Sequence, residues 1–282
     1  MASTQPMTAA ASSAGANACA GIAPEDREAI ARIAGNMVAG HGLGVRAVER
    51  IGRVANAALD RTIGWLLPDG RDTLEDIASE ALWSLFGAAR TGLGAVPGED
   101  RPLVHRGIVT ASGAVAGFAG GPLALAEIPF AMAMMFRAIA LVARRHGEDL
   151  DDTETRRACL EVFGFGTLRA ATAAEEEVEA SYWAVRAALT HAPLRVFIRA
   201  VAARFSVVVS DQALATATPV IGALAGSSVN LLFMRHFQTM ADIHFTLRAL
   251  ERKYGDAERV RACFDHAVAE ARARRHLFRR HG

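Results

Sequence analysis

The chain has 282 residues, of which 31 are Lys or Arg and 30 are Asp or Glu, and 51% are hydrophobic. This length suits one large or two small domains, and the apolar content excludes a wholly disordered chain. Only 6% of the residues are aromatic, and the abundance of Ala and Gly favours closely packed helices. Three cysteines (Cys19, Cys159 and Cys263) are too few and too scattered for a disulfide framework or a cysteine zinc site, and we expect no metal or cofactor.

The N-terminal segment predicts a disordered leader over residues 1–22. It carries no Lys or Arg before Cys19, and its residues are small and polar, which excludes a secretory signal. We therefore expect a cytoplasmic protein, with a peripheral position at the inner membrane as an option. Pro24, Glu25 and Asp26 suit the first turn of a helix.

Helical periodicity with polar start signals recurs along the rest of the chain. The predicted helices cover residues 24–40, 45–67 and 72–90, and further helices begin near residues 151, 175 and 256. Residues 92–102 form a loop rich in Gly and Pro.

Two long segments carry no charge. They span residues 107–126 and 212–234, and Glu127 and Arg137 are the only charges between the first segment and Arg144. We predict an all-α fold whose single multi-helix domain covers residues 23–256. Two long apolar helices rich in Gly and Ala, over 107–145 and 219–253, are expected at its centre. A basic C-terminal helix and tail is expected over 257–282.

The uncharged segments are long enough to cross a bilayer core. Their Ala, Gly, Ser and Val residues gain little on insertion, however, and Pro219 and Asn230 interrupt the second segment. Small residues spaced four apart let helix backbones approach closely. These close-packing residues are Gly113, Gly117, Gly121, Gly222 and Gly226. The pattern favours buried helices over conditional membrane insertion, and conditional insertion over a stable span.

The last twelve residues carry five arginines and no acid. A basic cluster with adjoining apolar side chains is typical of contact with anionic lipid, and a solvated helix end is the alternative. The expected contact residues are Arg272, Arg274, Arg275, Leu277, Phe278, Arg279 and Arg280. The rest of the chain is acidic on balance, so we expect no nucleic-acid partner.

No nucleophile elbow, phosphate loop or dinucleotide fingerprint is present. The weak candidates for a catalytic pocket are Glu127, Asp211, His236 and His244. The two histidines stand eight residues apart, which places them about 12 Å apart along a helix and excludes a shared metal. Arg137 and Asn230 are expected as buried polar residues, with Arg137 able to pair with Glu127.

The chain resembles EcsC-family proteins over about residues 100–256. The residues that carry the resemblance are those at 113–122, Glu127, Pro129, Arg137, 146–150, 159–163, 181–189, 204–210, 219–223, Asn230, 236–238, 244–245 and 250–255.

The resemblance implies a bacterial, largely helical protein and supplies no established activity. Together with the residue patterns, it favours a non-enzymatic protein that contacts anionic lipid or a membrane protein. A hydrolase-like enzyme and a soluble adaptor of a membrane transporter remain as alternatives.

Overall fold

The computed structural model describes residues 18–39, 84, 87–91, 93, 101–119, 121–168, 182–184, 186–187 and 219–281. Within these ranges it leaves out the side chains of 116–119, 121–129, 163–168, 219–230, 233 and 278–281. The predicted helix 45–67, most of the helix 72–90 and most of the region 175–189 lie outside the described residues.

The described residues are helical and contain no strand, so the predicted all-α fold is confirmed. The main helices are α2 (Pro24–Ala39), α5 (Pro102–Ala119), α6 (Gly121–Arg145), α7 (Thr153–Leu168), α10 (Pro219–Tyr254) and α11 (Ala257–His281). The chain groups into two compact units. One unit contains residues 41–241, and the other contains residues 1–40 and 242–282, so that α10 contributes to both.

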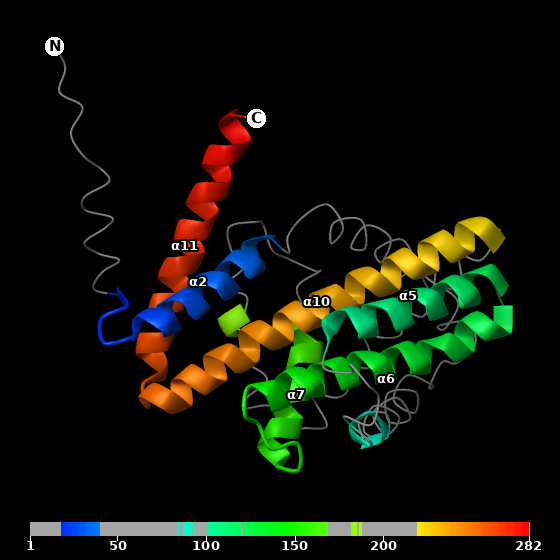
Figure 1. Ribbon diagram of the computed structural model, residues 1–282, viewed down its shortest axis with the longest axis horizontal. Coiled ribbons are helices and arrows are strands. Elements are labelled where there is room, and N and C mark those ends of the chain that lie inside the picture. The colour runs from blue at the N-terminus through cyan, green and yellow to red at the C-terminus, as the bar shows by residue number, and fades with distance from the viewer. Residues whose placement is uncertain are drawn as a thin grey trace, which may run out of the picture. The chain divides into compact units, whose positions relative to one another are not determined.

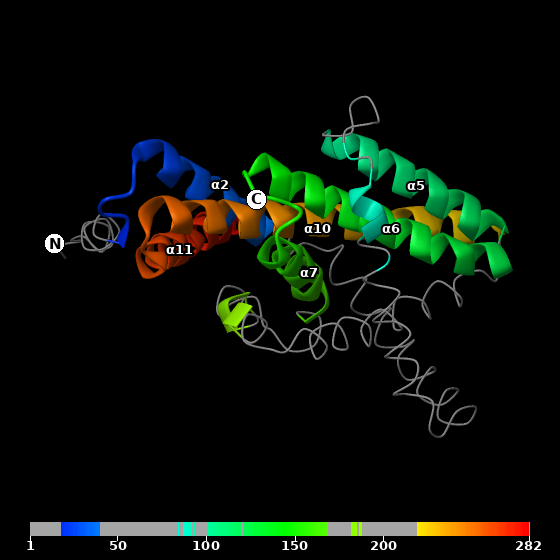
Figure 2. The same cartoon turned by 90° about the horizontal axis from the view of Figure 1, so that it is seen from below.

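In the unit of residues 41–241, α5 and α6 lie side by side and are joined at one end (Figures 1 and 2). The first part of α10 runs beside them. The single long helix expected over 107–145 is therefore wrong, because this segment forms two helices. The break falls at Gly120-Gly121-Pro122. Since Pro lacks an N–H and suits the first turn of a helix, Pro122 favours a new start there. The second long helix is confirmed as α10.

The predicted helix starts near residues 151 and 256 have polar caps, and a glycine ends α6. Gly147 has a φ of 77°, and the Glu148 N–H donates to the Ala143 carbonyl at 3.1 Å, which closes the end of α6. Asp152 Oδ2 accepts a 3.0 Å bond from the Thr155 N–H and caps α7. Asp256 caps α11 in the same way, through the Arg259 N–H at 2.9 Å.

In the other unit, α2 packs on α11. Their buried residues recur at helical spacing. On α2 these are Ile30, Ile33, Ala34 and Met37, and on α11 they are Val260, Cys263, Phe264, Ala267 and Val268. The predicted helix over 24–40 is confirmed by α2, which ends at Ala39.

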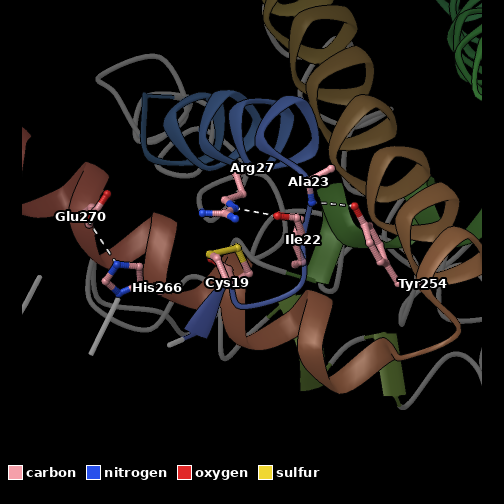
Figure 3. The surroundings of a disulfide bond; sticks show 8 residues. Cys19, Ile22, Ala23, Arg27, Tyr254, His266 and Glu270 are labelled. Carbon is pink, nitrogen blue, oxygen red and sulfur yellow. Dashed lines mark hydrogen bonds and ion pairs between the residues drawn. A yellow bond between two sulfur atoms is a disulfide. The ribbon is translucent and has the colours of Figure 1, made fainter. Parts of the chain in front are cut away.

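A disulfide between Cys19 and Cys263 ties the start of this unit to α11 (Figure 3). It joins residues 244 positions apart in the sequence. Gly21, with a φ of 78°, turns the chain from Cys19 into α2, and Ile22 is 1% exposed. Residues 18–22 are thus part of this unit. The predicted disordered leader over residues 1–22 is wrong for these five residues. Three scattered cysteines do not form a framework, but two of them form this single bond.

Polar contacts hold the N-terminal end of α2 to the last turn of α10. Lys253 Nζ donates to Asp26 Oδ2 at 2.7 Å, and the Tyr254 hydroxyl donates to the same oxygen. That hydroxyl also accepts a 2.9 Å bond from the Ala23 N–H. Burial alone would raise the pKa of Asp26, but the bonds from Lys253 and Tyr254 and the charge of Lys253 outweigh it. The pKa therefore lies below its ordinary value of 3.8.

We predict that breaking the disulfide lowers the free energy of unfolding, because the unfolded chain regains the freedom of a long loop. The expected loss is about 2–4 kcal/mol, measured by urea denaturation with and without a thiol reductant. The double variant Cys19→Ser/Cys263→Ser should match the reduced protein and show no response to reductant. Equal stability of the oxidised and reduced protein would contradict a structural role for this bond.

We predict that Asp26 stabilises the folded protein and that acid removes this stabilisation. Because its folded pKa is lowered, its contribution is complete above about pH 4. The contribution disappears as the pH falls through the folded pKa. Asp26→Asn should lower the free energy of unfolding at pH 7 by about 1–2 kcal/mol and flatten its decline below pH 4. Urea titrations of both proteins from pH 7 to pH 3 test this, and parallel curves would argue against it.

Candidate functional site

Helix α5 has one buried and one exposed face, and both lack acidic residues. His105, Val109 and Gly113 follow one another at four-residue spacing and are buried. The opposite face is apolar and exposed. We call it the α5 stripe, and it consists of Leu103, Gly107, Ile108, Ala111 and Val115.

The α5 stripe is open to solvent along its length. Leu103 is 72% exposed and Val115 is 62% exposed. A Cβ added at Gly107 would find no atom within 4 Å. Phe130 of α6 is a further large apolar side chain at the surface of this unit, with 44% exposure. Exposed apolar residues that occur singly are ordinary, but a continuous stripe along a helix is typical of a contact surface.

No described helix combines the length and the apolarity needed to cross a bilayer. The α5 stripe instead gives one helix an apolar side, as in helices that lie in a membrane interface.

Two cations stand at the N-terminal end of the α5 stripe. Arg101 precedes α5 and is exposed, and Arg106 lies one turn into the helix and is half-buried. The Arg106 Nε–H donates to Gln238 Oε1 at 2.7 Å. Gln238 Nε2 in turn donates to the Pro102 carbonyl at 3.0 Å. Gln238 is only 6% exposed, so this buried amide fixes the position of the Arg106 guanidinium.

The positive charge of Arg235 affects the guanidinium of Arg106. Arg235 of α10 is exposed and precedes Gln238 by three residues. Partial burial lowers the pKa of Arg106 below its ordinary value, and the positive charge of Arg235 lowers it further. The positive charge of Arg235 therefore acts on the Arg106 guanidinium.

Only the two histidines among the weak catalytic candidates have described side chains. Asp211 lies outside the described residues, and so does the side chain of Glu127 on α6. His244 is fully buried, with its ring edge-on to Phe245 at 5.2 Å between centroids. His236 is half-buried, with its ring edge-on to Phe237 at 5.7 Å. Among the described residues, no group of three His, Cys, Asp or Glu side chains could hold a metal ion.

Arg137 supports a turn of the same unit. Its Nη1 donates to the carbonyls of Ala89 and Thr91, at 3.0 and 2.9 Å. A cation at the free carbonyls of a helix end is favourable, and residues 87–90 are helical. Arg137, which was expected to be buried, is half-buried and has a structural role. Asn230 lies on α10, and its side chain is not described.

The close-packing glycines lie on the expected helices. Gly113 is on the buried face of α5, the helix that packs on α6. Gly117 follows it on α5, Gly121 begins α6, and Gly222 and Gly226 are on α10. For these last four, only the helix assignment is described.

The basic C-terminal residues form the last turns of α11. Arg275 donates to the Val38 carbonyl near the end of α2, and Arg274 pairs with Glu270 at 3.2 Å. Arg272 is half-buried, and Leu277 is 59% exposed. The side chains of Phe278, Arg279 and Arg280 are not described. Arg274 and Arg275, which are expected lipid-contact residues, therefore also have contacts within the protein.

Sequence reasoning missed the pairing of Arg106 with Gln238 and its proximity to Arg235. The signal was available, because Arg106 is the last charge before the segment 107–126 and Arg235 is the first charge after 212–234. It also missed the α5 stripe, because an uncharged segment does not reveal which of its faces is covered.

The family comparison agrees with the resemblance in the sequence. The EcsC protein family matches residues 68–250, which is more than half of the chain. The match begins before the region that carries the resemblance and includes α5, α6, α7 and most of α10. No curated protein and no solved structure matches the chain. By the extent of the family match, the chain belongs to the EcsC protein family.

Proposed function

We propose that the protein is a non-enzymatic, membrane-peripheral member of its family that contacts anionic lipid. In this proposal the α5 stripe enters the interfacial region of the bilayer. The observation that carries it is the continuous exposed apolar face of α5, on a helix that has no acidic residue.

The expected energies support reversible binding. The three large side chains of the α5 stripe each contribute about 0.3–0.6 kcal/mol in the apolar region, or about 1–2 kcal/mol together. Each arginine near an anionic surface adds about 1 kcal/mol. Because the apolar and the electrostatic parts are of similar size, binding should need both the stripe and the anionic charge of the membrane.

Charge complementarity favours a lipid surface over a protein partner. Residues 101–126 contain Arg101, His105 and Arg106 and no acid, and residues 212–241 contain Arg235 and His236 and no acid. The end of α11 carries further arginines, of which Arg274 pairs with Glu270 at 3.2 Å. We assign the main apolar contact to α5 and an auxiliary electrostatic contact to α11.

We predict that polar substitutions on the α5 stripe weaken membrane binding. Leu103→Gln/Val115→Gln should lower the partition coefficient for vesicles of phosphatidylcholine with phosphatidylglycerol about tenfold, or about 1.4 kcal/mol. Gly107→Leu should raise it severalfold, because it adds an apolar side chain in open space. Flotation at 0.1 and 0.5 M salt measures both, and high salt should weaken binding to anionic vesicles.

Leu277→Gln is the matched control, since it removes an exposed apolar side chain from α11. It should change the partition coefficient less than about threefold. Loss of binding in Leu277→Gln, with none in the α5 variant, would move the contact to α11. No flotation with any vesicle would rule out the lipid function and leave the adaptor and hydrolase alternatives.

A further inference from the structure

Three described arginines of this unit form ion pairs with carboxylates, which the two arginines beside Gln238 do not form with any described residue. Arg90 and Arg156 pair with Asp151, and Arg157 pairs with Glu161. In the described part of the chain, neither Arg106 nor Arg235 forms an ion pair with a carboxylate. The positive charge of Arg235 acts against that of Arg106. A bound anion would therefore reduce the electrostatic repulsion between these two charges.

The guanidinium of Arg106 is oriented for such an anion. Its Nε–H is occupied by Gln238, and Gln238 is fixed by the Pro102 carbonyl. Its Nη1 and Nη2 make no hydrogen bond with the described residues. Two parallel N–H donors match the oxygens of a phosphate or carboxylate. Arg235, one helical turn before Gln238, supplies a second positive charge.

We propose that Arg106 and Arg235 form a binding site for the phosphate ester of an anionic phospholipid headgroup, in which Gln238 is the positioning residue. This inference rests on the proposed lipid function and names the group that is recognised. Arg106 and Arg235 are the binding residues, and Gln238 acts through Arg106.

The place of Arg106 on α5 favours a lipid over a free phosphate. Leu103, the most exposed large side chain of the α5 stripe, is three residues before Arg106. Val115 is nine residues after Arg106, about 14 Å along the helix at 1.5 Å per residue. A phosphate held at Arg106 therefore leaves the acyl chains of the same molecule within reach of the stripe.

Calorimetric titration of the full-length protein tests the site without a membrane. The titrants are dihexanoyl phosphatidylglycerol below its micelle concentration, inorganic phosphate, and hexanoate, which has the acyl chain without the phosphate. We expect the phospholipid to bind most tightly, and phosphate and hexanoate to bind more weakly because each lacks part of the lipid. Arg106→Gln and Arg235→Gln should each weaken phospholipid binding at least tenfold.

Arg101→Gln is the matched control, because it removes one exposed charge from the same end of α5. It should weaken binding less than twofold. Arg106→Lys keeps the charge without the planar guanidinium and should bind about as weakly as Arg106→Gln. Since Arg235 is exposed, Arg235→Gln keeps the test valid even if the Arg106 variants lose stability in thermal melts.

Three results would contradict the proposed site. The first is phospholipid binding that is unchanged in Arg106→Gln and Arg235→Gln, and the second is an equal loss of phospholipid affinity in Arg101→Gln. The third is inorganic phosphate that binds as tightly as the phospholipid. The first result would mean that the two arginines do not bind the phospholipid. The second would mean that binding depends on the overall positive charge of this surface, and the third that the site binds free phosphate.

Flotation of the same variants separates this site from the proposed function. If phospholipid binding in the titration depends on Arg106 and Arg235 but the protein does not float with vesicles, the membrane function is rejected and the site is kept. Flotation that does not depend on Arg106 and Arg235 would keep the function and reject the site.

Discussion

The absence of charge along α5 after Arg106 is the constraint on which the functional surface depends. A helix of small and apolar residues can pack closely on a neighbour through one face, and here that face contains His105, Val109 and Gly113. Because of the same composition, the opposite face, which is the α5 stripe, has no polar side chain. The stripe that begins at Leu103 therefore faces solvent without a charge of its own. Close helix packing and an apolar surface thus arise from one feature of the sequence.

The unit of α2 and α11 is held by contacts between the two ends of the chain. The Cys19–Cys263 disulfide, the Asp26 contacts with Lys253 and Tyr254, and the bond from Arg275 to the end of α2 all join them. This arrangement gives the basic C-terminal residues a structural role as well as the proposed contact with lipid. Disulfides persist in oxidising compartments and are rare in the cytosol, so the cytoplasmic localisation stays a prediction.

The fold class and the helix ends were predictable because they depend on local signals. Asp152, Gly147 and Asp256 act as the caps that their positions indicate. The division of 107–145 into α5 and α6 was missed, although Pro122 marked it. Pairings across the fold were not predictable, because Arg106 and Gln238 are 132 residues apart and Cys19 and Cys263 are 244 apart. Separations of this size leave no trace in periodicity or local composition. The candidate site was therefore identifiable only as an uncharged segment bordered by arginines.

The depth of Val115 in a membrane is the most direct test of the proposed lipid contact. A nitroxide attached to Val115→Cys should become accessible to oxygen and shielded from a water-soluble relaxation agent when anionic vesicles are added. The same label at Glu258→Cys, an exposed position on α11, should stay accessible to the water-soluble agent. If both labels keep equal access to water in the presence of bound vesicles, the α5 stripe does not enter the membrane and the proposal is wrong.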